Sequence, residues 1–346
     1  MCVAMDATAA SIGAGENGDQ LTIAHFLNDW LAHIRGRVRA VTYEGYEALL
    51  RLHALPVLGA VPLAELRPLD LQRLYGDLLN PPVAEGRPGL SGGSVRNLHL
   101  VLTQALSQAV RWQLLAANPA AGAQPPRPKR PAPVTVDQPL IELLLAAVAG
   151  TWLEIPATVA AATGMRRGEI LALRWADLAN DYSAARVQRT LQPTKTGLVF
   201  EQPKTPRSRR TVLLPQFLRP YLERHRETQT ARRVEVGDGW VEHGLVVERG
   251  DGQPLNPDTL SAGWARHMRK HRLPPVRFHD LRHGHATLML TQGVHPKVVS
   301  ERLGHASIGI TLDLYSHVLP TLQQQAAQAF DELFLPEATD LPAAGR

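Results

Sequence analysis

The sequence has a single cysteine, Cys2, among its 346 residues. One thiol can form neither an intramolecular disulfide nor a cysteine-based zinc site, so neither can stabilise this fold. This is typical of a protein that stays in the reducing cytosol. Long apolar runs are missing as well: the run Leu140–Gly150 is shorter than the roughly 18 residues of a membrane span and contains Glu142. The sequence therefore predicts no membrane anchor, and residues 1–20, without a basic start, predict no secretory signal.

Several motifs of common enzyme chemistry are also absent. The chain has no G-x-x-x-x-G-K-[ST] phosphate loop, no H-E-x-x-H pair, no carboxylate-rich metal cluster and no G-x-S-x-G elbow. These absences disfavour nucleotide hydrolysis, zinc-dependent hydrolysis and α/β-hydrolase chemistry. We expect a site that uses no metal and no cofactor.

The composition predicts a folded, basic protein of about two domains. Hydrophobic residues make up 44% of the chain and charged residues 20%, which is enough apolar material for a sizeable core. Lysine and arginine number 37 against 32 acidic residues, which gives a formal net charge of +5. This excess permits a nucleic-acid or membrane-surface partner without requiring one.

The pattern along the chain predicts a mainly α protein with a small β-sheet, an α+β fold. We expect a disordered leader over 1–20, a helical domain over 21–118, a Pro-rich linker over 119–134, a second domain over 135–335 and a flexible tail over 336–346. The linker carries Arg127, Lys129 and Arg130. Composition supports two interpretations of these charges equally, as solubilising residues or as a strap on phosphates.

Apolar spacing predicts the individual elements. In the first domain we expect a helix capped by Thr22, a helix over about 42–52 ended by Pro56 and Gly59, a helix over 68–79, and a long helix capped by Ser94. In the second domain we expect helices over about 137–149 and 153–162, strands over 186–191, 198–202 and 211–214, and mainly helix after 215.

Cationic and imidazole groups cluster in the second domain. The segment 266–283 reads RHMRKHRLPPVRFHDLRH, and if it is helical near its end, His279 and Arg282 lie on one side. A second basic stretch, PKTPRSRR over 203–210, lies between two predicted strands and could project as a hairpin. Arg166 follows a Thr-Gly turn just before a helix, where an anion is favoured. A solvated helix face is the usual explanation of such charge runs.

Together these groups suggest a phosphodiester site that works without metal. Two guanidiniums can hold the non-bridging oxygens of a phosphate and stabilise the pentacoordinate transition state. A lysine or imidazole can protonate the leaving oxygen. The candidate nucleophile is Tyr315, with His305 ten residues upstream. Taken singly, Tyr315 is more often a packing tyrosine and His305 a surface or capping residue.

Five segments in order then resemble the tyrosine recombinases of the phage-integrase family. They are TGMRRGEILALRW (163–175), PKTPRSRRTVLLP (203–215), HDLRH (279–283), LGH (303–305) and TLDLYSHVLP (311–320). Each segment alone is weak, whereas all five in this order and spacing are specific. The resemblance implies a SAM-like core-binding domain over 21–118 and a mixed α/β catalytic domain, which together form a C-shaped clamp on DNA.

The resemblance also implies a role for each matching residue. Arg166 and Arg282 would clamp the scissile phosphate, and Lys204 would protonate the 5′-oxygen leaving group. His279 would assist in proton transfer or in activating the tyrosine, and His305 would hydrogen-bond the phosphate and support the transition state. Tyr315 would attack and form a 3′-phosphotyrosyl bond. Glu169 would orient other site groups, whereas His283 and His317 would pack or cap, and Gly284 stands where the family often has a hydroxyl residue. The expected DNA contacts are Arg127, Lys129, Arg130, Arg207, Arg209 and Arg277.

The partner implied is double-stranded DNA, bound by a homotetramer on two duplexes, with possible accessory DNA-bending or directionality factors and no membrane. The apolar face of residues 321–335 would dock on a neighbouring protomer, although packing on its own domain is the simpler alternative. The expected location is cytoplasmic and nucleoid-associated. With about 20 residues before the first helix, we expect no separate arm-binding domain.

Alternatives to a phage or mobile-element integrase stay open at this point. A Xer-type dimer resolvase would use the same chemistry, and a type IB topoisomerase would use a similar site as a monomer. A catalytically silent, architectural DNA-binding protein is a further alternative, against which the intact set of site residues argues.

Overall fold

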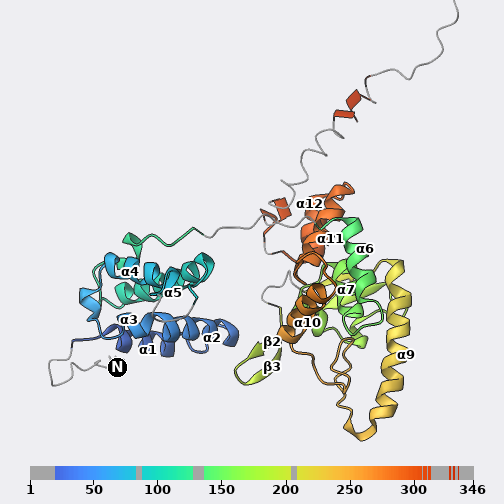
Figure 1. Cartoon of the computed structure of the whole chain (residues 1–346), viewed down its shortest axis with the longest axis horizontal. Helices are drawn as coiled ribbons and strands as arrows, with labels where there is room; N and C mark the ends of the chain where they lie inside the picture. The colour runs from blue at the N-terminus through green and yellow to red at the C-terminus, as the bar shows by residue number, and fades with distance from the viewer. Residues whose placement is uncertain are drawn as a thin grey trace, which may run out of the picture. The chain divides into compact units, whose positions relative to one another are not determined.

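The computed structural model describes residues 20–82, 88–127, 136–203, 209–305, 307–309, 311–312, 327–328, 330–331 and 334. The chain divides into two compact units, Met1–Ala132 and Pro133–Arg346, and each unit has its own apolar core. Figure 1 shows the first unit in blue to teal and the second in green to red. None of the described helices is both long enough and apolar enough to cross a membrane.

The described part of the first unit is all helical. Its longer elements are α1 (Ile23–Ile34), α2 (Ala40–Leu49), α4 (Pro68–Leu79) and α5 (Gly92–Arg111). Thr22 caps α1 as predicted, because its side chain accepts a hydrogen bond from the His25 backbone at 3.4 Å. The apolar face of α1 is buried in full, which confirms the helical spacing.

Two predicted helix limits in this unit are wrong. The second helix does not stop before Pro56: a π-helical turn, Leu50–Ala54, leads directly into α3 (Leu55–Leu58). Pro56 lies in the first turn of α3, directly after the wider π-turn. Its ring therefore fits there without interrupting the helical course of the chain. The cap of α5 is Ser91 rather than Ser94, whose backbone N–H donates to Ser91 Oγ at 3.1 Å.

The start of the predicted linker packs on the first unit. Residues Pro119–Gly122 form a short 3₁₀ turn, and Ala120 and Ala123 are buried in the core of that unit. Asn118 caps this turn and also donates to the Thr103 carbonyl of α5 at 3.0 Å. This part of the Pro-rich segment is therefore ordered by contacts with α5.

The second unit confirms the predicted α+β class. Its helices are α6 (Gln138–Val148), α7 (Glu154–Thr163), α8 (Arg167–Leu171), α9 (Arg219–Val236), α10 (Pro257–Lys270), α11 (Asp280–Thr291) and α12 (Pro296–Leu303). Asp137 caps α6, and its side chain accepts from the Leu140 backbone at 3.0 Å. Large apolar residues from most of these helices, Trp264 and Leu144 among them, fill the core.

The strands are arranged differently from the prediction. The expected strand over 186–191 is two strands, β1 (Ala184–Val187) and β2 (Thr190–Thr194). β1 pairs antiparallel with β4 (Arg210–Leu213), and β2 pairs antiparallel with β3 (Gly197–Glu201). The basic connection between β3 and β4 therefore joins two separate two-stranded sheets, and the expected β3–β4 hairpin is wrong, because each strand pairs with a different partner.

Three helices of this unit meet where the predicted site residues gather. Helix α7 ends at Thr163 and is capped by Gly164, whose φ of +66° lies in the left-handed region that glycine tolerates best. A Cβ at Gly164 would come within 2.4 Å of the Leu303 side chain, so the turn lies directly against the end of α12. Helix α11 packs on α12 through Leu290, Val299 and Leu303.

Candidate active site

Arg166 lies at the N-cap position of α8, immediately after the Gly164 turn. Its backbone N–H and its Nη1 both donate to the Glu169 carboxylate at 2.8 Å. Its Nη2 donates to the Gly304 carbonyl at 2.9 Å. The Arg166 side chain is still 38% exposed, so a ligand can reach a guanidinium that the protein already orients.

Arg282 lies in the first turn of α11 and is only 3% exposed. Its Nη1 donates to the Gly164 carbonyl at 2.5 Å and its Nη2 to the Leu303 carbonyl at 2.9 Å. Burial, reinforced by the neighbouring Arg166, lowers the pKa of Arg282 to about 9. The group therefore stays protonated at pH 7 and forms a buried positive charge beside Arg166.

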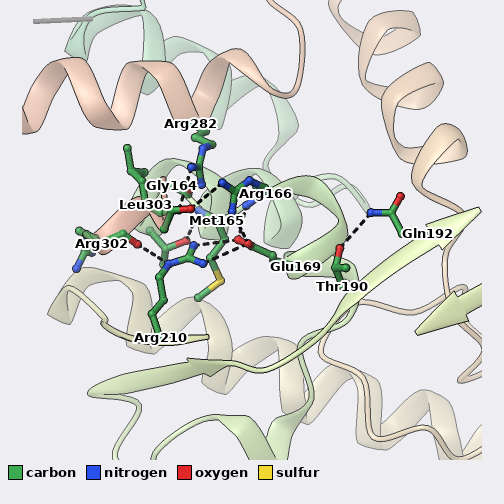
Figure 2. A network of polar contacts seen from close by, with 12 residues as sticks. Gly164, Met165, Arg166, Glu169, Thr190, Gln192, Arg210, Arg282, Arg302 and Leu303 are labelled. Atoms are coloured by element: carbon green, nitrogen blue, oxygen red, sulfur yellow. Dashed lines mark hydrogen bonds and ion pairs between the residues drawn. The ribbon is translucent and has the colours of Figure 1, made fainter. Parts of the chain in front are cut away.

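The end of α12 brings three arginines together (Figure 2). Three consecutive carbonyls, those of Arg302, Leu303 and Gly304, accept hydrogen bonds from Arg210, Arg282 and Arg166 in that order. The carbonyls at a helix C-terminus lack partners within the helix and carry the negative end of its dipole, so they attract cations. The fold thus brings three guanidiniums, from β4, from α11 and from the N-cap of α8, together at the C-terminal end of α12.

Arg210 belongs to this cluster but was not among the predicted site residues. Its side chain is 7% exposed and donates to both oxygens of Glu169, at 3.2 and 2.9 Å, and to the Arg302 carbonyl at 2.6 Å. Strand alternation was the available signal: Arg210 lies two residues before buried Val212 and so shares its inward face. The neighbouring Arg209 is exposed and donates to Gln202.

Glu169 is the buried acidic residue of the cluster. It is 5% exposed, and burial raises the pKa of its carboxyl. Hydrogen bonds and charge from Arg210 and Arg166 outweigh burial and hold the pKa below its usual value. Glu169 is therefore ionised and joins the two arginines.

The predicted histidines surround this cluster. Next to α11, His279 and His283 make an edge-to-face ring contact with centroids 5.0 Å apart, and beyond α12 the His305 Nδ1 lies 2.9 Å from Thr311 Oγ1. Partial burial and the adjacent positive charges lower the pKa of His279 and of His305 to about 4. Both rings are accordingly neutral at pH 7, and a phosphate bound beside them would raise their pKa values.

A further layer behind the cluster was also missed. His285 Nδ1 donates to the Ala161 carbonyl at 2.8 Å, and its Nε2 accepts from Arg302 Nε at 3.1 Å. Arg302 Nη2 also donates to the Ala162 carbonyl at 3.2 Å. This network fixes the end of α7 to α11 and α12, and burial lowers the pKa of His285 to about 4.

A cavity of about 320 Å³ opens beside the cluster. It is lined by Arg210, Lys297, Ser300, Glu301, Gly304, His305 and Ile308. The cavity therefore gives solvent access to His305 and to one side of the arginine cluster. Within the part of the chain that is described, no three histidine, cysteine or acidic side chains are grouped so as to hold a metal ion.

The other predicted site residues divide into two groups. Arg277 is 78% exposed and paired with Asp280 at 2.7 Å, and Arg127 is exposed at the end of the first unit. Outside the described residues lie Lys129, Arg130, Lys204, Arg207, Tyr315, His317 and most of 321–335. The structure thus brings together Arg166, Glu169 and Arg282, with His279 and His305 beside them.

Family models match both units of the chain. The model of the phage integrase family matches residues 136–321, and the model of the phage integrase N-terminal SAM-like domain matches residues 22–79. A XerC-like tyrosine recombinase of Caldanaerobacter subterraneus subsp. tengcongensis is 27% identical over 343 residues, which cover 93% of this chain and 86% of that protein. The ICEBs1 integrase of Bacillus subtilis is 34% identical over 176 residues, 51% of this chain and 48% of that protein.

Solved structures show the same fold. The Tn1549 transposon integrase in complex with transposon right end DNA superposes with a TM-score of 0.75 at 20% identity, over 91% of this chain and 99% of that one. A lambda integrase tetramer bound to a Holliday junction gives a TM-score of 0.59 at 16% identity, over 86% of this chain and 78% of that one. Because one family model alone spans more than half of the sequence, the chain belongs to the phage integrase family of tyrosine recombinases.

Proposed function

We propose that this chain is a site-specific DNA recombinase of a phage or another mobile element, which cuts and rejoins strands through a 3′-phosphotyrosyl bond at Tyr315. The observation that carries the proposal is the convergence of Arg166 and Arg282 on adjacent carbonyls at the end of α12. Two guanidiniums fixed side by side, with N–H groups to spare, suit the two non-bridging oxygens of one phosphodiester.

The proposed reaction has the following steps. The Tyr315 oxygen attacks phosphorus, the bond from phosphorus to the 5′-oxygen breaks, and the phosphotyrosyl bond forms. Lys204 gives a proton to the leaving 5′-oxygen, and His279, neutral at pH 7, accepts the phenol proton. Arg166, Arg282 and His305 stabilise the charge on the equatorial oxygens. A 5′-hydroxyl of a partner strand then reverses the steps, so that one phosphodiester replaces another with no net change in bond type.

The assembly that we propose is a homotetramer on two duplexes, docked through residues 321–335. The lambda integrase structure supports this arrangement, because that protein is a tetramer on a Holliday junction. Phosphate contacts from Arg127, Lys129, Arg130, Arg207, Arg209 and Arg277 would supply most of the affinity, which makes binding dependent on salt. Accessory DNA-bending or directionality factors belong to the same proposal.

A second candidate is a dimer resolvase with the same chemistry. The XerC-like relative favours it, since that protein matches over nearly the whole chain. The integrases of ICEBs1 and of Streptomyces ambofaciens, the latter 28% identical over 330 residues, favour the mobile-element assignment. Phage or transposon genes beside the coding sequence would support the first candidate, and a housekeeping context the second.

Covalent trapping tests the proposal. Nicked genomic DNA fragments are incubated with the wild type and with Tyr315→Phe, denatured, and the DNA that stays bound to protein is sequenced. We expect a discrete site from the wild type and none from the variant. Native DNA binding by both proteins with no covalent adduct from either would refute the recombinase assignment in favour of an architectural protein.

A further inference from the structure

Arg210 is the side chain that connects the parts of the site. Its partners come from three elements: Arg210 begins β4, Glu169 lies in α8, 41 residues earlier, and the Arg302 carbonyl lies in α12, 92 residues later. Each element adjoins a group of the proposed mechanism. The β3–β4 connection contains Lys204, α8 begins after Arg166, and α12 ends two residues before His305. One guanidinium therefore fixes the mutual positions of three segments.

The charges of the cluster give Arg210 a second effect. Glu169 carries one negative charge, and it contacts both Arg166 and Arg210. If Arg166 were its only partner, the carboxylate would cancel the positive charge that the phosphate needs. Because Arg210 contacts both oxygens of Glu169 and is almost fully buried, it is the better placed counter-ion. Three arginines against one carboxylate then leave the cluster with two net positive charges for the phosphate.

We infer that Arg210 is a positioning residue of the recombinase: it neutralises Glu169 and fixes α8 against the end of α12, and so keeps Arg166 oriented, and the cluster net positive, toward the scissile phosphate. This inference rests on the proposed function. Arg210 itself acts through Glu169 and Arg166, because its own guanidinium is committed to the carboxylate and to a carbonyl.

The experiment measures cleavage and binding separately. The probe is a nicked duplex that carries the site recovered by covalent trapping, and the readouts are the single-turnover rate of adduct formation and the Kd from fluorescence anisotropy. The variants are Arg210→Met, Arg210→Lys, Glu169→Gln and the double variant Glu169→Gln/Arg210→Met. The control is Arg186→Met, since Arg186 is an exposed arginine of the adjacent strand β1.

We expect Arg210→Met to slow adduct formation by about 100-fold and to change Kd by less than about 3-fold, because the interaction lost acts mainly on the transition state. Arg210→Lys should lose about 10-fold, since an ammonium keeps the charge without the two-pronged contact. The double variant should be about 5-fold or more faster than Arg210→Met, because it also removes the uncompensated carboxylate. Arg186→Met should match the wild type.

A pH profile separates this role from a purely structural one. Without Arg210 the pKa of Glu169 rises, so that lowering the pH protonates the carboxyl and releases Arg166 from it. The defect of Arg210→Met relative to the wild type should therefore shrink between pH 8 and pH 6. Circular dichroism and thermal unfolding identify a variant that fails to fold, in which case Arg210→Lys and the double variant supply the comparison.

The results distinguish the positioning role of Arg210 from the recombinase function of the protein. If the wild type forms a Tyr315-dependent adduct while Arg210→Met reacts within about 3-fold of it, the positioning role is overturned and the proposed function stands. A double variant that is no faster than Arg210→Met also overturns the role. If the wild type forms no adduct at all, the proposed function is refuted, and this inference is refuted with it.

Discussion

Replacing Arg282 with lysine is the sharpest test of the proposed phosphate clamp formed by Arg166 and Arg282. The arginine uses one N–H of Nη1 on the Gly164 carbonyl and one of Nη2 on the Leu303 carbonyl, which leaves its remaining N–H groups for a phosphate. A lysine keeps the positive charge, but its single nitrogen cannot serve two carbonyls and a phosphate in the same geometry. The substitution therefore removes preorganised donors while it preserves the charge.

The expected loss is large in rate and small in affinity. Losing one preorganised donor to a transition-state oxygen costs about 3 kcal/mol, which corresponds to a rate loss of roughly 100-fold or more. A buried carbonyl left without a donor destabilises the fold by about 1–3 kcal/mol. DNA affinity should change by less than about 3-fold, because in the proposed complex Arg282 is one of many phosphate contacts.

The assay is single-turnover adduct formation on a nicked duplex, with Arg219→Lys as the control. Arg219 is an exposed residue of α9 paired with Glu223, so its substitution should leave the rate unchanged. An Arg282→Lys enzyme that is folded and cleaves within about 5-fold of the wild type would refute the argument, because a diffuse positive charge would then be sufficient.

Three further predictions concern Gly304, His285 and Arg277. Gly304→Ala should destabilise the protein in denaturant titration, and slow cleavage in adduct assays, more than Gly293→Ala does. Both glycines have positive φ, but only at Gly304 would an added Cβ come within 2.9 Å of Arg210 Nη1, so equal effects of the two substitutions would contradict this contact. His285 has a pKa of about 4 in the fold against 6.5 unfolded, so its contribution to stability is complete above pH 6.5 and is lost as the pH falls toward 4. In guanidinium unfolding we expect the free energy of unfolding to fall by about 2 kcal/mol between pH 8 and pH 5, and to change less with pH in His285→Gln; parallel pH profiles would exclude this histidine as the cause. Arg277→Ala should lower the slope of log affinity against log salt by about one, measured by anisotropy, and an unchanged slope would show that Arg277 contacts no phosphate.

Much of the site was predictable because its residues lie in short, ordered motifs. Arg166 and Glu169 are three residues apart in one turn, and their contact follows directly from that spacing. Arg282 and His279 likewise share the start of α11, as the spacing indicated. Contacts of this kind can be predicted from sequence because both residues lie within a single turn.

The rest depended on contacts between distant segments. Arg210 reaches residues 41 and 92 positions away, and Arg302 reaches His285 from the following helix. No local pattern distinguishes buried Arg210 from exposed Arg209 except the alternation of β4. The path of the chain through Pro56 was mispredicted for a related reason, since helix propensity describes α-turns and not the π-turn that admits the proline here.

The three guanidiniums at the end of α12 prepare the protein to bind an anion, but they lower its stability when no anion is bound. Like charges held together without a ligand repel one another, and this repulsion is part of why the pKa of Arg282 is lowered. Without a bound anion the protein therefore retains this repulsion, which a phosphate at the proposed site would reduce. A fold arranged in this way is least stable when it is empty, and its melting temperature should rise when any duplex, or a simple oxyanion such as sulfate, occupies the cluster.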